Sequence, residues 1–150
     1  MTRSTARELA VHFSYELIFG GSGAEEAMSR LFDDPDYFST LKGEYEIYSE
    51  MPDVRSMAYL KNIVTGVYEH ALELDSYIEK YARGWKFDRI SRIAAAIMRV
   101  AMFEILYVQD VPSGAAANEA VEIAKKYETE ETAAFINGIL GSFIKNEIQA

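Results

Sequence analysis

Apolar residues recur at three- and four-residue steps along most of the chain, which is the spacing of amphipathic α-helices. The pattern predicts a first helix that is capped by Thr2 or Thr5 and ends at the Gly-Gly-Ser-Gly run 20–23. Because this run follows a helix and opens no strand, we interpret it as a helix end and short linker rather than a phosphate-binding loop.

The pattern is weaker in the next part of the chain. A short helix is predicted over 24–32, followed by a turn in which Asp34 or Asp36 can cap the next element. An aromatic-rich segment over 37–48 has only a weak helical period, and we interpret it as a helix.

The second part of the chain has stronger stripes of apolar residues, meaning longer runs at three- and four-residue steps. The run 51–53, Met-Pro-Asp, starts a long predicted helix that ends at Gly84, and the break at 111–114 contains Pro112. The remaining predicted helices cover 90–103, 115–127 and 130–148. No stretch alternates with period two long enough to predict a strand. The pattern therefore predicts an all-α protein with two packed sub-bundles, the stronger one starting at Asp53, in a single domain over 1–150.

Composition excludes several classes of protein. The chain has no cysteine, which excludes disulfides, thiolate metal sites and a cysteine nucleophile. Its first residues contain no apolar signal region, and no uncharged apolar stretch reaches the length of about 18 residues that a membrane span needs. We therefore expect a cytoplasmic protein with no membrane partner.

The net charge of −9 is unevenly distributed. Residues 24–58 hold nine acids against three bases, whereas residues 80–99 hold six bases against one acid, Asp88. A negative total argues against nucleic-acid binding, because phosphate contacts need lysine and arginine. The segregation weakens that argument, since a local basic cluster can still hold an anion, although a solvated face is the commoner explanation.

Catalytic chemistry finds no support in the sequence. The two histidines, His12 and His70, are far apart, and neither has a second histidine at metal-ligand spacing. No phosphate-loop, nucleophile-elbow or dinucleotide motif occurs. We therefore predict neither an enzyme, nor a metal site, nor a cofactor.

The sequence gives more support to RNA binding than to catalysis. Arg3 and Arg7 lie four residues apart, so on a helix they share a face with Tyr15 two turns further on. Two guanidinium groups and an aromatic ring on an exposed face can hold a phosphate backbone and stack a base of single-stranded RNA. On composition alone, a solvated helix face with Tyr15 in the core remains the favoured alternative.

Several longer segments carry a family resemblance. The opening segment 6–10, Ala-Arg-Glu-Leu-Ala, is followed by Tyr15, and Trp85 and Pro112 lie between the later matches. Those matches are 59–67 (YLKNIVTGV), 97–104 (IMRVAMFE), 118–125 (NEAVEIAK) and 135–140 (FINGIL). Together they resemble the NusB family of transcription antitermination factors over most of the chain, leaving about 20–57 without a clear counterpart.

The resemblance implies an all-α fold of about seven helices in two sub-bundles. It implies a non-enzymatic factor that binds the boxA element of ribosomal RNA leader transcripts together with the ribosomal protein NusE, so that RNA polymerase resists termination. The residues that it assigns to RNA are Arg3, Arg7, Tyr15 and Phe135. It places Asp88 and the neighbouring bases Arg89 and Arg92 near the partner and RNA surfaces.

The chain also departs from this family. Where the family commonly has three successive arginines, this chain has Arg3 followed by Ser4 and Thr5, so fewer counterions would be released on RNA binding. Where the family often has an acid–base pair, this chain has Ala94 and Ala95. If that pair helps to hold NusE, we expect its loss to make the contact with NusE more apolar or weaker. An alternative function is therefore a helical protein-interaction module with weakened RNA binding, and one version of this alternative is a homodimer.

Overall fold

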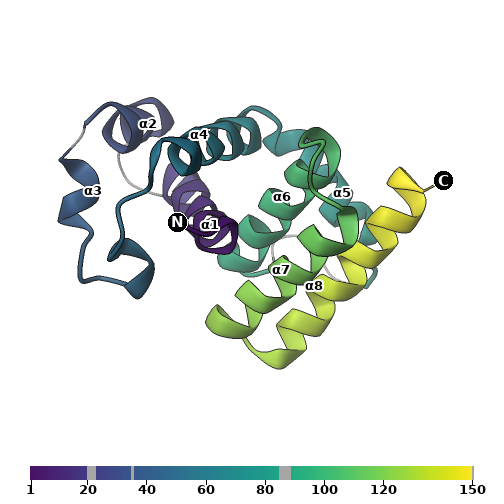
Figure 1. The fold of residues 1–150 in the computed structure, drawn as a ribbon. Helices are drawn as coiled ribbons and strands as arrows, with labels where there is room; N and C mark the ends of the chain where they lie inside the picture. Colours follow the sequence, from purple (N-terminus) through teal and green to yellow (C-terminus); the bar gives the residue numbers. More distant parts are fainter. Residues whose placement is uncertain (20–22, 35, 85–88, 150) are drawn as a thin grey trace. The chain divides into compact units, whose positions relative to one another are not determined.

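The computed structural model describes residues 1–19, 23–34, 36–84 and 89–149. Within these ranges the chain forms eight α-helices and no β-strand, which confirms the all-α prediction. The helices group into two compact units, Met1–Tyr68 and Glu69–Ala150. Figure 1 draws the first unit in purple and blue and the second in teal, green and yellow.

The first unit contains α1 and the shorter elements that follow it. These are α1 (Arg3–Phe19), α2 (Ala24–Asp33), α3 (Tyr37–Thr40), the 3-10 turn η1 (Glu46–Tyr48) and α4 (Val54–Glu69) up to Tyr68. The hydroxyl of Thr2 accepts a hydrogen bond from the backbone N–H of Thr5 at 3.1 Å, so Thr2 caps α1. Helix α1 contacts α2 and η1, and α2 contacts α3.

The predicted helix over 37–48 is wrong beyond its first turn. Helix α3 ends at Thr40, and Gly43 then adopts a φ of +100°, which a continuing right-handed helix does not permit. Aromatic packing holds this segment in place of helical hydrogen bonds. The rings of Phe38 and Tyr48 lie 5.8 Å apart, and each lies 6.3 Å from the ring of Phe13 on α1.

The second unit is built around a central helix. Its elements are α5 (Ala71–Tyr81), α6 (Arg92–Tyr107), α7 (Ser113–Tyr127), α8 (Glu130–Phe143) and the π-helical turn η3 (Ile144–Ile148). Residues 94–104 of α6 are all buried, as expected for a helix that is covered on every side. Helices α5, α7 and α8 each contact α6, and α7 and α8 lie side by side (Figure 1).

The long helix predicted from 51–53 to Gly84 is in fact two helices. Its start is confirmed, because Asp53 caps α4, but the helix breaks at His70, where φ is −104° and ψ is 16°. The three- and four-residue spacing of apolar residues continues across His70. The sequence pattern therefore does not indicate that the helix breaks there. The boundary between the two units therefore lies at Tyr68 and not at Asp53, where the stripes become stronger.

An ion pair fixes α6 against α5 in the second unit. The Arg99 side chain is buried and donates from Nε to Asp75 Oδ1 at 2.6 Å and from Nη2 to Asp75 Oδ2 at 3.1 Å. A two-point contact of this kind restricts both side chains to one geometry. It contributes to a rigid α6, whose N-terminus forms part of the site described below.

Candidate nucleic-acid interface

Arg3 lies in a polar pocket of the first unit, which we call the N-terminal pocket. Its lining residues are Met1, Arg3, Asp53, Arg55 and Ser56, and its volume is about 280 Å³. The Arg3 guanidinium carbon lies 4.2 Å from the centroid of the Tyr59 ring on α4. This cation–π contact covers one face of the guanidinium and leaves its N–H groups available in the plane of the group.

The acidic residue of the N-terminal pocket already has partners. Asp53 Oδ1 accepts from the backbone N–H of Ser56 at 2.8 Å, which caps α4, and Asp53 Oδ2 accepts from the Met1 ammonium at 3.2 Å. The hydrogen bonds from Ser56, and then the contact with the ammonium, lower the pKa of Asp53 to about 2. The carboxylate is therefore ionised at neutral pH, and both of its oxygens accept hydrogen bonds from groups other than the two arginines.

Arg7 and Tyr15 do not share an exposed face with Arg3. Arg7 retains only 6% of its accessible surface, so the exposure expected for this residue is wrong, while Tyr15 is half-buried with its ring 5.2 Å from that of Phe19. The reason is that α1 buries residues on most of its circumference, including Ala6 and Ser14. A four-residue spacing places two side chains near one another but does not set how wide the buried stripe is.

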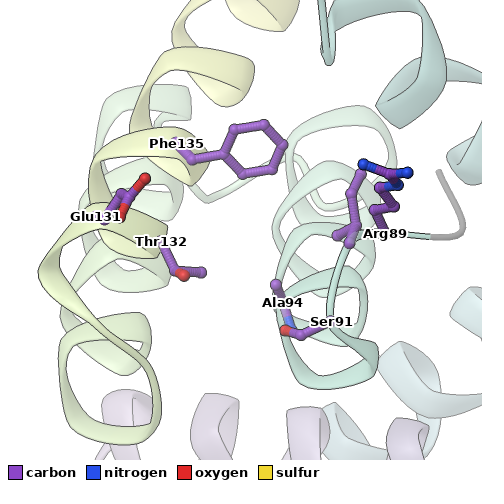
Figure 2. Close-up of a pocket in the computed structure, with 7 residues that line it drawn as sticks. Arg89, Ser91, Ala94, Glu131, Thr132 and Phe135 are labelled. Atoms are coloured by element: carbon purple, nitrogen blue, oxygen red, sulfur yellow. The ribbon is translucent and has the colours of Figure 1, made fainter. Parts of the chain in front are cut away.

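Phe135 lies in a second pocket, which we call the Phe135 pocket and which belongs to the second unit. The lining residues are Arg89, Ile90, Ser91, Ala94, Glu131, Thr132 and Phe135, and the volume is about 220 Å³. Figure 2 shows the Phe135 ring and Thr132 pointing from α8 toward the start of α6, with Arg89 on the opposite side. The half-buried ring therefore faces a space that has a cation on its other wall.

Capping hydrogen bonds hold the walls of the Phe135 pocket. Ser91 Oγ accepts from the Ala94 N–H at 3.1 Å and donates to Glu128 Oε1 at 2.6 Å, which ties the start of α6 to the residue that follows α7. On the other wall, Thr129 Oγ1 accepts from the Thr132 N–H at 3.1 Å and caps α8. Both helix starts are thereby fixed before any ligand binds.

Two of the residues assigned to the partner lie at the start of α6, where Arg89 precedes the capping Ser91 and Arg92 is the first helical residue. Asp88 lies outside the described residues, whereas Arg89 and Arg92 are both exposed. Ala94 and Ala95 are buried, so neither side chain offers a charged contact at the start of α6. Ala94 also lines the Phe135 pocket, where its small side chain leaves space beside the ring.

The acidic segment keeps its charges in solvent. All nine acids between 24 and 58 are exposed, whereas Arg30 in the same segment is only half-exposed and lies over the ring of Tyr37 at 5.5 Å. These exposed acids give this segment of the first unit a net negative charge. Arg3 and Arg55 of the N-terminal pocket add positive charge to the same unit.

The histidines are engaged with aromatic neighbours. His12 Nδ1 lies 3.2 Å from the Tyr48 hydroxyl, and the ring of His70 lies 4.5 Å from that of Tyr107. Among the residues placed by the structure, no group of three or more histidines and acids could hold a metal ion. In the same part of the chain, no helix has the length and apolar character needed to cross a membrane.

Comparison with known proteins identifies the family. The model of the NusB family matches residues 4–145, which is nearly the whole chain. The chain belongs to the NusB family. The transcription antitermination protein NusB of Ruminiclostridium cellulolyticum is 37% identical over 148 residues, covering 99% of this chain and 92% of its own. NusB of Acetivibrio thermocellus is 34% identical over 150 residues, covering 100% of this chain and 93% of its own. The chain is accordingly a transcription antitermination factor of the NusB type.

Solved structures share the NusB fold. A NusB structure from T. maritima has a TM-score of 0.67 at 28% identity and covers 97% of this chain and 92% of its own. A crystal structure of antitermination factors NusB and NusE in complex with double-stranded RNA has a TM-score of 0.74 at 22% identity, with 95% of this chain and 96% of that chain covered. At that identity the second likeness concerns the fold alone.

Sequence reasoning about the NusB resemblance missed Arg55. It counted this residue only as one of three bases in an acidic segment, and the N-terminal pocket instead brings it together with Arg3. The signal was present in the order Asp53-Val54-Arg55-Ser56, because an N-cap aspartate fixes the first turn of the helix and with it the place of Arg55.

Proposed function

We propose that this NusB-family chain binds boxA-type single-stranded RNA of ribosomal RNA leader transcripts together with the ribosomal protein NusE, and so helps RNA polymerase resist termination. It acts in the cytoplasm by binding and not by catalysis, with residues 1–150 working as one functional domain. The observation that carries the proposal is the Phe135 pocket of a NusB-family protein, in which a half-buried ring faces an exposed arginine.

The Phe135 pocket has the chemistry to accept a base. The face of an aromatic ring stacks on any base, and an arginine nearby attracts the phosphate that accompanies it. Thr132 adds a hydroxyl that can bond to a base edge. The pocket is preorganised by the caps at Ser91 and Thr129, so little conformational entropy is lost when a base enters.

Arg3 contributes attraction for the phosphate backbone. Its guanidinium is exposed and braced against Tyr59. The half-buried Tyr15 offers part of its ring for a further contact, whereas Arg7 is buried and has a supporting role inside α1 in this proposal. Such contacts supply affinity that depends on salt and carries no sequence information.

The start of α6 is the proposed contact with NusE. Arg89 and Arg92 are exposed there, next to Asp88 in sequence, and the buried Ala94 and Ala95 supply no charge to the contact. Support for NusE as the partner is the family itself, together with the complex of a NusB of the same fold with NusE and RNA.

A binding experiment tests the proposal. Fluorescence anisotropy of a labelled boxA-type RNA is measured with the chain alone, with NusE alone and with both, and a scrambled RNA of the same length serves as control. We expect the tightest binding with both proteins and weaker binding to the scrambled RNA. Equal binding to the two RNAs, or no effect of NusE, would contradict the proposal.

A homodimeric protein-interaction module is the second candidate. The nine exposed acids of 24–58 and the buried Arg7 favour it, because both weaken the attraction for RNA. Sedimentation equilibrium distinguishes the two candidates. A monomer that gains mass only when NusE and RNA are added supports the first candidate, whereas a dimer that ignores RNA supports the second.

A further inference from the structure

We propose that Arg55 and Arg3 together form a phosphate-binding site in the N-terminal pocket and hold one backbone phosphate of the bound RNA. The inference rests on the proposed RNA-binding function and adds to it a contact residue, Arg55, from outside the N-terminal arginine region. It is carried by two arginines that line the same pocket of the first unit.

Within the described residues, neither arginine of the pocket has an anionic partner. Neither Arg3 nor Arg55 forms an ion pair with any residue that the structure describes, although nine exposed acids lie in the same unit. Two like charges that share a pocket repel each other unless an anion lies between them. With Asp53 ionised, the side chains that line the pocket still carry a net charge of +1, which favours an anion.

The start of α4 adds to this potential. Arg55 is the second residue of a 16-residue helix, so the pocket lies at the positive end of the helix dipole. Asp53 satisfies the N–H of Ser56, whereas the N–H groups of the first two helical residues are not used by the helix itself. Helix starts of this kind favour phosphate when cationic side chains are also present.

The two arginines of the site come from different helices. Arg3 is the first residue of α1, whereas Arg55 is the second residue of α4, and both line the pocket. Because Tyr59 already braces Arg3, a phosphate that binds here orders only the second side chain.

The test compares two variants of one helix. Arg55→Gln removes the charge in the pocket, and Lys61→Gln removes the same charge from an exposed residue of α4 that does not line it. The affinity of the full chain with NusE for boxA-type RNA is measured between about 50 and 200 mM salt. Circular dichroism confirms that both variants remain folded.

We expect Arg55→Gln to weaken binding and to reduce the slope of log K against log salt by about 0.7, which is the value for one phosphate contact on a single strand. Lys61→Gln should leave the slope nearly unchanged. Equal slopes for the two variants would overturn the proposal. If the wild-type chain with NusE does not bind the RNA at all, the proposed function fails first, and the phosphate site in RNA binding fails with it.

A second measurement separates RNA phosphate from free phosphate. Inorganic phosphate is titrated into the wild-type chain while the arginine Nε–H resonances are followed by NMR. We expect the Arg3 and Arg55 signals to shift and boxA-type RNA to shift them in the same direction. If phosphate shifts them and RNA does not, the pocket binds free phosphate, and the assignment to the RNA backbone is wrong.

Discussion

The two pockets carry arginine in contrasting surroundings. The N-terminal pocket is lined mainly by polar residues, among them Arg3, Arg55 and an engaged carboxylate, and no aromatic residue lines it. The Tyr59 ring that Arg3 contacts lies outside this lining. The Phe135 pocket combines one arginine with a half-buried ring and the apolar side chains of Ile90 and Ala94. The first therefore suits a phosphate group and the second suits a base.

This difference separates affinity from selectivity. Phosphate contacts position a nucleic acid and respond to salt, whereas contacts with bases discriminate among sequences and respond to salt much less. Substitutions in the two pockets should then differ in kind as well as in size. Salt dependence is the property that distinguishes them.

The largest effect is expected for Phe135→Ala. Loss of a stacking ring costs about 1–3 kcal/mol per base, so the affinity for boxA-type RNA should fall by about 5- to 150-fold with an unchanged salt slope. Phe135→Leu is the matched control, because it keeps an apolar side chain and removes only the aromatic face. Affinity restored fully by leucine would contradict a stacking role.

Arg3→Gln should have a smaller effect of a different kind. Removal of one phosphate contact should reduce the salt slope by about 0.7 and weaken binding most at low salt. Lys42→Gln, an exposed cation of the same unit that does not line the pocket, should leave the slope in place. If both variants lower the slope equally, the effect comes from the net charge of the protein, and the N-terminal pocket does not make a particular phosphate contact.

Glu131→Gln should strengthen RNA binding slightly. Glu131 lines the Phe135 pocket, and its carboxylate repels a phosphate that accompanies a stacked base. Glu130→Gln is a close control, since Glu130 lies in the same first turn of α8 but does not line the pocket. An equal gain from both variants would assign the effect to overall charge.

The smallest effect concerns pH and the frame of the N-terminal pocket. The folded-state pKa of Asp53 is lowered from 3.8 to about 2, so ionised Asp53 stabilises the fold above pH 3.8, and this contribution is lost as the pH falls toward 2. In Asp53→Asn the free energy of unfolding should therefore fall less over that interval. The free energy of unfolding is measured with urea at several pH values. If it falls by the same amount with pH in the wild type and in the variant, Asp53 does not contribute.

Much of the fold could be predicted because the local signals agree with the final packing. The cap at Thr2 and the presence of a helix at α6 both follow from short-range patterns. The break at His70 could not be predicted, since the apolar period continues across it. The conformation of residues 37–48 could not be predicted either. It depends on the packing of Phe38 and Tyr48 against Phe13, which is distant in sequence.

The site was predictable as a set of residue types but not as a geometry. Arg3 and Phe135 each line a pocket, whereas Arg7 is buried because α1 is covered on most sides. Arg55 joins Arg3 only through tertiary structure, so no spacing rule along the chain could pair residues of α1 and α4. Burial and pairing of charges are properties of the folded chain.

The most direct test of the account is a double-mutant cycle on RNA binding. The affinity for boxA-type RNA with NusE is measured for the wild type, Arg3→Gln, Phe135→Ala and the variant with both substitutions. If both pockets contact the RNA, the fold-loss of affinity in the double variant should equal the product of the fold-losses in the two single variants. Its salt slope should be reduced to the value of Arg3→Gln and no further. A double variant that binds as tightly as the wild type would contradict the assignment of RNA binding to these two pockets.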